Sequence, residues 1–110
     1  MCKIVGSFYL KKTDNGNLLG EFTNNALFTV TAENASLTEA GMQLYEGRYL
    51  STWYEEGELC TAELVIDHLA NAEYEGLKYH LVWNDLNKGP IYEAEALLAE
   101  GVLGHYLSLS

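Results

Sequence analysis

Aromatic side chains with polar tips are the groups in this sequence best suited to holding a small molecule. Eight tyrosines and two tryptophans occur in 110 residues. In the stretch 45–53 the large rings alternate with glycine and serine, so an extended strand would gather the rings on one face with small residues between them. Phenol and indole groups on an apolar wall can hydrogen-bond an amphipathic ligand. The residues that this pattern predicts as ligand-binding are Tyr45, Tyr49, Trp53, Tyr79, Trp83, Tyr92 and Tyr106.

These rings could serve in either of two ways, and the sequence leaves both open. They could line a cavity, with Tyr49, Trp53, Tyr79 and Trp83 as its wall, or they could pack against one another and fill the interior. Buried hydroxyl groups need hydrogen-bond partners, which a ligand or ordered water can supply. This requirement favours a cavity, in which Tyr45, Tyr92 and Tyr106 would make polar contacts.

Metal chemistry and acid–base chemistry are not favoured by the remaining reactive groups. A metal would need His68, His80 and His105 to converge, but the alternation puts His68 inside and the other two outside. Paired carboxylates need burial to separate their pKa values, and we expect solvated positions for the glutamates of the turn at 55–58 and for Glu93 and Glu95. We therefore predict no catalytic residue, no metal site and no cofactor.

The two cysteines are expected to be free thiols. Cys60 lies in the middle of a predicted strand on its apolar face, where a thiol usually acts as a small hydrophobic group. Cys2 lies near the terminus, and the pair lacks the spacing of a metal site. A bridge between them remains the alternative.

The charge balance excludes several classes of partner. Sixteen acidic residues against six Lys and Arg give a net charge of −10, which repels the phosphates of nucleic acids and of anionic lipids. No apolar run approaches the roughly 18 residues of a membrane span. We expect neither a nucleic-acid nor a membrane partner and, by default, a cytoplasmic location, with a leader removed from the chain as the alternative.

Alternation of apolar and polar residues predicts strands over most of the chain. Asn15-Gly16 favours a type I′ hairpin turn. The segment Glu33–Gly41 is predicted to be a loop that could act as a lid, with a helical turn capped by Ser36 as the alternative. Residues 94–100 also favour helix, but the period of two decides for strand. The predicted strands cover 4–11, 18–22, 26–32, 43–54, 59–68, 77–83, 91–99 and 102–109.

The fold predicted from these elements is all-β, as a single domain spanning residues 1–110. A meander of seven or eight antiparallel strands with short links can close into a barrel. The alternating large and small residues suit a barrel of this size, which holds either packed side chains or one small ligand.

Several of these strands resemble parts of calycin-type barrels, the group that includes avidins, lipocalins and fatty-acid-binding proteins. An avidin opening, in which Gly, an aromatic residue and Asn precede an apolar-Thr-apolar strand, is similar to Gly20-Glu21-Phe22-Thr23-Asn24-Asn25 followed by Phe28-Thr29-Val30. Gly-x-Tyr elements of such barrels resemble Gly47-Arg48-Tyr49 and Gly104-His105-Tyr106. This chain differs in having a strand before the opening, in having Phe22 rather than Trp, and in lacking the Ser and Asp set that holds biotin. It also resembles small bacterial proteins of uncharacterised function.

The first functional hypothesis is that the protein is a binding module for a small hydrophobic or amphipathic ligand in an aromatic-lined interior. The second is a structural or protein-interaction domain with a filled barrel, and the third a cofactor-free isomerase-type enzyme. Outward apolar residues also predict a homodimer. The residues of this outer stripe are Leu50, Tyr54, Val82, Leu103, Leu107 and Leu109.

Overall fold

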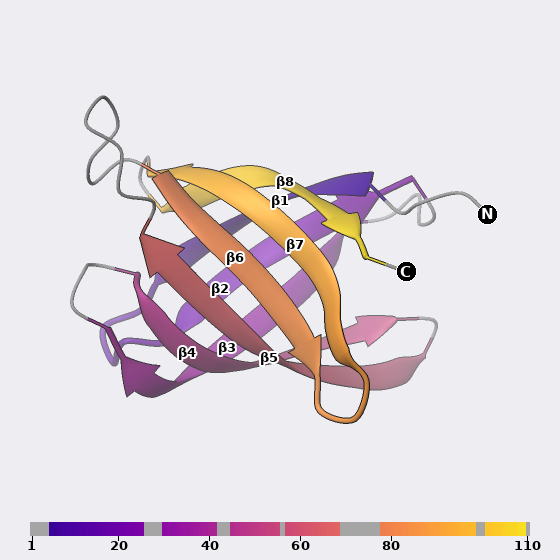
Figure 1. The fold of residues 1–110 in the computed structure, drawn as a ribbon, viewed down its shortest axis with the longest axis horizontal. Coiled ribbons are helices and arrows are strands. Elements are labelled where there is room, and N and C mark those ends of the chain that lie inside the picture. The colour runs from indigo at the N-terminus through magenta and orange to yellow at the C-terminus, as the bar shows by residue number, and fades with distance from the viewer. Residues whose placement is uncertain are drawn as a thin grey trace.

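The fold is a closed antiparallel β-barrel, seen in a computed structural model that describes residues 5–25, 30–41, 45–55, 57–68, 78–98 and 101–109. These residues form eight strands and no helix, which confirms the predicted all-β class (Figure 1). The strands are β1 (Val5–Lys12), β2 (Leu18–Asn24), β3 (Thr31–Ala40), β4 (Gly47–Glu55), β5 (Glu58–His68), β6 (Lys78–Asp85), β7 (Gly89–Leu98) and β8 (Val102–Ser108). The described part of the chain therefore contains no helix that could cross a membrane.

Each strand pairs with the next one along the chain, and β8 pairs with β1 to close the barrel. In the closing register Phe8 of β1 lies between Phe22 of β2 and Gly104 of β8. The predicted meander is thus confirmed, and its closed eight-stranded form is compatible with a calycin-like fold. Because every strand has two neighbours, no long unpaired edge remains among the described strands.

The interior is filled by the alternate residues of each strand, as the period of two predicts. In β5 the inward positions Ala62, Leu64 and Ile66 are buried, and the residues between them are more exposed. In β6 the same holds for Tyr79, Leu81 and Trp83. These inward residues form one continuous apolar core.

The prediction for Glu33–Gly41 is wrong, because this segment is almost entirely strand β3. Single-residue preferences suggested a loop or a helical turn, but pairing with strands on both sides decides the conformation. Ala35 is the central example, because it pairs with Leu18 of β2 and with Ser51 of β4 and is fully buried. No lid is formed here. The strand predicted at 26–32 meets the observed one only at Thr31 and Ala32, and residues 26–29, with Phe28, lie outside the described residues.

Two local predictions at strand ends also need correction. In the first hairpin the amide of Gly16 bonds to the carbonyl of Thr13 and the amide of Thr13 to the carbonyl of Asn17. Only Gly16 has a positive φ there, 87°, so the link is a type I turn with a glycine bulge rather than type I′. Strand β7 starts at Gly89, inside a segment predicted as loop, while its later part confirms strand over helix.

Candidate functional site

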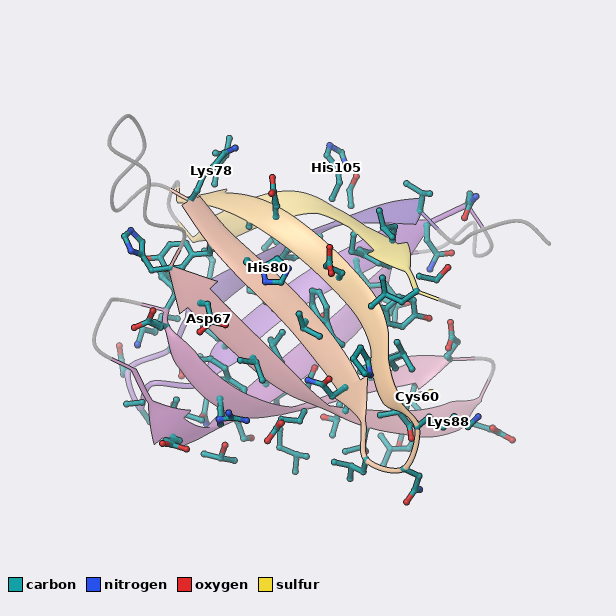
Figure 2. All side chains as sticks on the ribbon, viewed as in Figure 1. Cys60, Asp67, Lys78, His80, Lys88 and His105 are labelled. Carbon is teal, nitrogen blue, oxygen red and sulfur yellow. The ribbon has the colours of Figure 1, made fainter. Side chains whose placement is uncertain are left out.

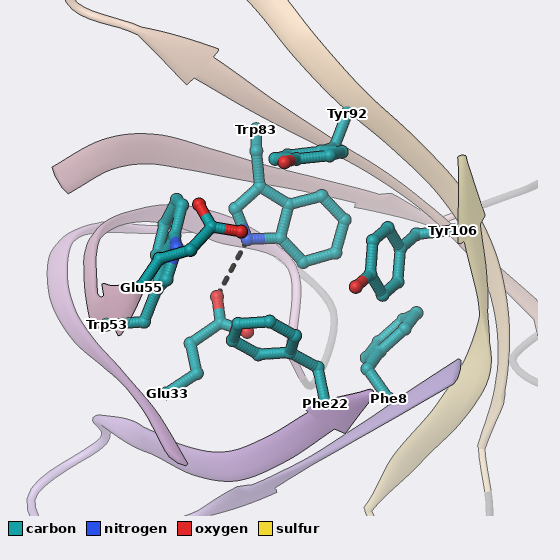
Figure 3. A pocket seen from close by; sticks show the side chains of 8 residues that line it. All are labelled: Phe8, Phe22, Glu33, Trp53, Glu55, Trp83, Tyr92 and Tyr106. Carbon is teal, nitrogen blue, oxygen red and sulfur yellow. Dashed lines mark hydrogen bonds between the residues drawn. The ribbon is translucent and has the colours of Figure 1, made fainter. Parts of the chain in front are cut away.

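A small pocket (Figure 3) opens at the end of the barrel where β2, β4 and β6 end and β3, β5 and β7 begin. Every strand except β5 contributes to its lining. The free space is about 340 Å³ when the open mouth is included, of which about 20 Å³ can be occupied by the centre of a water molecule, room for one or two waters. The lining residues are Phe8, Phe22, Glu33, Trp53, Glu55, Trp83, Tyr92 and Tyr106.

The aromatic residues of the pocket meet edge to face and so form the walls of a box. The ring centroids of Phe8 and Trp83 lie 5.5 Å apart with planes at 86°. Phe22 meets Trp53 at 6.2 Å and 88°, and Tyr106 packs against two of the other rings at a steep angle. Edge-to-face contacts are favourable in themselves, and rings at right angles cannot stack flat to close the space between them.

Glu33 is the one acidic side chain that lies deep within this aromatic box. Only 4% of it is exposed. Its Oε2 accepts hydrogen bonds from the hydroxyl of Ser51 and from the indole N–H of Trp83, the latter at 2.7 Å (Figure 3). Burial raises the pKa of the Glu33 carboxyl above its usual value of 4.5, although the two hydrogen bonds act in the opposite direction.

The second oxygen of Glu33 is left for the pocket. Within the described part of the chain Oε1 accepts no hydrogen bond. Every side-chain oxygen or nitrogen atom there that is completely buried does have a hydrogen-bond partner, so the Oε1 atom itself is not completely buried. Oε1 must therefore have some contact with the open space of the pocket. As a carboxylate oxygen it can accept a hydrogen bond, and as part of a protonated acid it can donate one.

The local sequence explains how an acidic residue reaches this position. Along β3, Glu33 shares the inward face with Ala35, and its neighbours Ala32 and Asn34 are exposed. Across the sheet it lies opposite Gly20 on one side and Trp53 on the other. The bond from Trp83 of β6 to Glu33 of β3 joins two strands that are not adjacent in the barrel.

Glu55 and the hydroxyl group of Tyr106 are two further polar groups of the pocket lining. Glu55, the last residue of β4, is partly exposed and points toward the same space as Glu33 (Figure 3). The hydroxyl of Tyr106 accepts from Asn24 at 2.9 Å and donates to the carbonyl of Thr23.

Two further polar groups of the lining remain open to interaction. Among the described residues, neither the indole N–H of Trp53 nor the hydroxyl of Tyr92 has a hydrogen bond in the structure. Burial raises the pKa of Tyr92, and the nearby carboxylate of Glu55 adds to this effect. The pocket therefore combines apolar walls with one carboxylate inside, another at the mouth, and donors between them.

The other half of the barrel interior is packed by tyrosines and has no part in the pocket. The hydroxyl of Tyr49, which is fully buried, donates to the carbonyl of Tyr45 at 2.9 Å. The ring of Tyr45 lies against that of Tyr79, and its φ of 71° places it in the left-handed region, which non-glycine residues rarely adopt. This packing and the hydrogen bond hold Tyr45 in that conformation.

The predicted site residues are thus divided between the two halves. The structure brings Trp53, Trp83, Tyr92 and Tyr106 together around the pocket, and it places Tyr45, Tyr49 and Tyr79 in the packed half. Sequence reasoning did not assign Phe8, Phe22, Glu33 or Glu55 to the site, and it treated Glu55 as a solvated turn residue. An acidic residue in phase with Ala35 and Leu37 was the available signal for Glu33, but it is visible only if the segment is read as a strand.

None of the three histidines belongs to the pocket lining. Cys60 is not a lining residue either, but its Sγ lies 3.9 Å from the carboxylate of Glu55, which is one. His80 and His105 lie on the outside of the barrel (Figure 2), where His80 approaches Glu93 at 3.7 Å and His105 bonds to Ser7 at 2.9 Å. His68 packs its ring against Tyr79. No group of three or more potential metal ligands occurs among the described residues.

Cys60 is a partly buried free thiol whose pKa is raised mainly by burial. Cys2 lies outside the described residues, so the structure does not address a pairing between the two. Glu56 of the acidic turn also falls outside that range. Comparison of the chain with protein-family models, with curated proteins and with solved structures finds no match.

Proposed function

We propose that the protein is a binding module that takes a small amphipathic molecule into the pocket at the β2–β3 end of the barrel. The apolar part of the ligand lies among the rings, and its polar group bonds to Glu33. The observation that carries this proposal is the Oε1 atom of Glu33, which faces an aromatic-lined space with no partner from the described chain. The sequence resemblance to a group that includes fatty-acid-binding proteins points the same way.

A purely structural role explains Glu33 poorly. Taking a carboxylate out of water is unfavourable unless it is paired and fully hydrogen-bonded. Glu33 has donors on only one oxygen and no cationic partner in the described chain. A neutral side chain at this position could accept the hydrogen bonds from Ser51 and Trp83 at a smaller desolvation cost. Ligand binding therefore explains the buried carboxyl group better than stability of the fold does.

The size of the pocket limits what can enter. Room for one or two waters accommodates a polar head group, while the rest of a ligand would extend outward past Tyr92 and Glu55, the two partly exposed residues of the lining. A molecule with the volume of a long-chain lipid would require the rings to move. The proposal is therefore restricted to small ligands.

Intrinsic fluorescence tests this proposal directly, because both tryptophans of the chain line the pocket. A ligand from a set of small amphipathic compounds should shift their emission and raise the melting temperature as its concentration increases. Tyr92→Phe removes a hydroxyl group from the pocket and should change the affinity for the ligand. Tyr79→Phe is the matched control: it removes a hydroxyl group from the packed half of the barrel and should leave the affinity unchanged. A broad set that alters neither emission nor melting temperature would contradict the proposal.

A second role as an interaction domain is favoured by apolar residues on the outside of the barrel. Leu50, Tyr54 and Leu59 lie on the outer face of β4 and β5, and Tyr54 is directly opposite Leu59 in the register. Tyr54 is 65% exposed and Leu59 59%. Apolar side chains gathered on one outer face often meet another protein surface, and we propose a second copy of this chain as that surface.

A further inference from the structure

We propose that the ligand is a small organic cation with at least one N–H, such as a primary alkylammonium, whose charged nitrogen bonds to Glu33 Oε1 and whose carbon chain lies among the pocket rings. This inference rests on the proposed function, since it assigns a chemical class to the ligand of the same pocket. The charges of the lining, the arrangement of the rings and the hydrogen bonds of Glu33 all support it.

The charges around the pocket are of one sign. Glu33 lies inside and Glu55 at the mouth, and the described lining includes no lysine, arginine or histidine. The whole chain carries a net charge of −10. Such a field concentrates cations at the mouth and opposes the entry of an anion.

The rings supply a second attraction that is specific to cations. The face of an aromatic ring carries partial negative charge, so a cation within about 6 Å of the ring centre is attracted, most strongly by tryptophan. Trp53 of β4 and Trp83 of β6 both line the pocket, and they meet Phe22 and Phe8, respectively, at nearly right angles. A small ammonium group inside the box would therefore lie close to several rings.

Glu33 is oriented to receive an N–H donor. The bonds from Ser51 and Trp83 both end on Oε2, which fixes the plane of the carboxylate and leaves Oε1 toward the cavity. An ammonium N–H at Oε1 would complete the hydrogen bonding of the buried acid and neutralise its charge in one contact. A quaternary ammonium could use the rings but not this bond, so a primary ammonium fits the site better.

Three probes of similar size distinguish the possible ligand classes: n-butylammonium, 1-butanol and butanoate. Each is titrated at pH 8 with tryptophan emission and calorimetry as independent readouts. The proposal predicts that n-butylammonium binds at least about tenfold more tightly than 1-butanol, because a hydrogen bond to a charged group is stronger than one between neutral groups. Butanoate should not bind measurably.

The outcomes separate the ligand class from the proposed function. If 1-butanol or butanoate binds as tightly as n-butylammonium, the cation assignment is wrong while the pocket still binds ligands. If none of the three binds but another amphipathic compound does, the cation assignment is again wrong. If no compound of any class binds, the proposed function fails as well.

Two substitutions on β3 test whether the preference for n-butylammonium depends on Glu33. Glu33→Gln should reduce the affinity for n-butylammonium to near that for 1-butanol, because it keeps the shape of the side chain but removes its charge. Glu39→Gln removes one negative charge from an exposed position of β3 and should keep the preference. Glu55→Gln should weaken n-butylammonium binding by a smaller factor, and it serves as the pocket variant if Glu33→Gln does not fold. Equal preference in the wild type and in all pocket variants that fold would overturn the assignment.

Discussion

A buried carboxylate with one oxygen fully bonded and the other facing a cavity favours ligand binding over stability. The hydrogen bonds to Oε2 of Glu33 stabilise its charge, while burial opposes it more strongly and raises the pKa of the carboxyl. In the ligand-free protein this residue therefore weakens the fold at neutral pH. Sites that bind charged ligands often show this conflict between stability and function.

Replacing Glu33 with glutamine should therefore stabilise the ligand-free protein. The amide oxygen can accept the bonds from Ser51 and Trp83, and no charge has to be buried. We expect a gain on the order of 1–3 kcal/mol in the free energy of unfolding at pH 8, the size of the penalty for an imperfectly paired buried polar group. Urea denaturation measures it, with Glu39→Gln as the control that should change stability little. A Glu33→Gln protein less stable than the wild type would contradict this account of Glu33.

The raised pKa of Glu33 also determines how the stability of the fold changes with pH. A folded-state pKa above the unfolded value means that the stability contributed by Glu33 is fully present below about pH 4.5 and is lost as the pH rises through the folded pKa. The advantage of Glu33→Gln over the wild type should accordingly grow with pH and then level off. Denaturation at several pH values between about 4 and about 8 would show this, and a constant difference would not fit.

The buried tyrosines predict a loss of stability in alkali. Burial raises the pKa of both Tyr49 and Tyr106 to about 12. The unfolded chain releases these protons near pH 10, so their contribution to stability is lost as the pH rises from about 10 through about 12. Ultraviolet titration at about pH 11 should show that both tyrosines are still protonated in the folded protein. Tyr49→Phe and Tyr106→Phe should each remove one tyrosine from that late-titrating class.

At the scale of the strands, the sequence predicted well wherever alternation was supported by large side chains. Strands β4, β5 and β6 follow that pattern with tyrosine, leucine or tryptophan on the inward face, and their faces were assigned correctly. Strand β3 has only one such residue, since its inward positions hold Glu33, Ala35 and Leu37. Its conformation is set by pairing with β2 and β4, which lie outside the segment itself, so its local residues could not reveal it.

Close approach of β1 and β2 explains why glycine is needed in the barrel wall. A Cβ at Gly20 would lie 1.8 Å from the carbonyl oxygen of Tyr9, which is backbone and cannot move aside without shifting β1. Gly20→Ala should therefore lower the free energy of unfolding by at least about 1–3 kcal/mol, as overpacking does in other cores.

A substitution in open space serves as the comparison for Gly20→Ala. Gly57 has a φ of 82°, and a Cβ added there would have no atom within 4 Å beyond its chain neighbours. Asparagine tolerates this backbone region, so Gly57→Asn should change the denaturation midpoint only slightly. If the two variants unfolded at the same urea concentration, close packing at Gly20 would not be the reason for its glycine.

At the scale of the whole molecule, closure of the barrel creates a site that no single segment contains. Four of the residues that the ring pattern selected, Trp53, Trp83, Tyr92 and Tyr106, line the pocket, because each is an inward residue at the same end of the barrel. The pattern could not separate these from the tyrosines of the packed half, since it fixes the face of a residue but not its height in the barrel. Height depends on the register between strands, which is a property of the closed structure.

The outer surface predicts association of two copies. Leu50 and Tyr54 are exposed on the outer face of β4, and Leu59 adjoins them on β5. Light scattering should show a dimer whose population increases with concentration, and Tyr54→Lys should shift it toward the monomer because a charge would be placed in an apolar contact. Leu97→Lys on β7 adds the same charge elsewhere on the outer surface and should leave the dimer intact. A monomer at all concentrations would exclude this surface as a self-association site.

The most direct test of the whole account is the titration of the Glu33 side-chain carboxyl by ¹³C NMR, with Glu33→Gln used to assign its signal. In the free protein its pKa should lie above the usual value of 4.5. With saturating n-butylammonium the pKa should fall, because the bound cation favours the ionised acid. A carboxyl that titrates at its ordinary value and does not respond to the amine would contradict both the burial of Glu33 in the pocket and its role in binding.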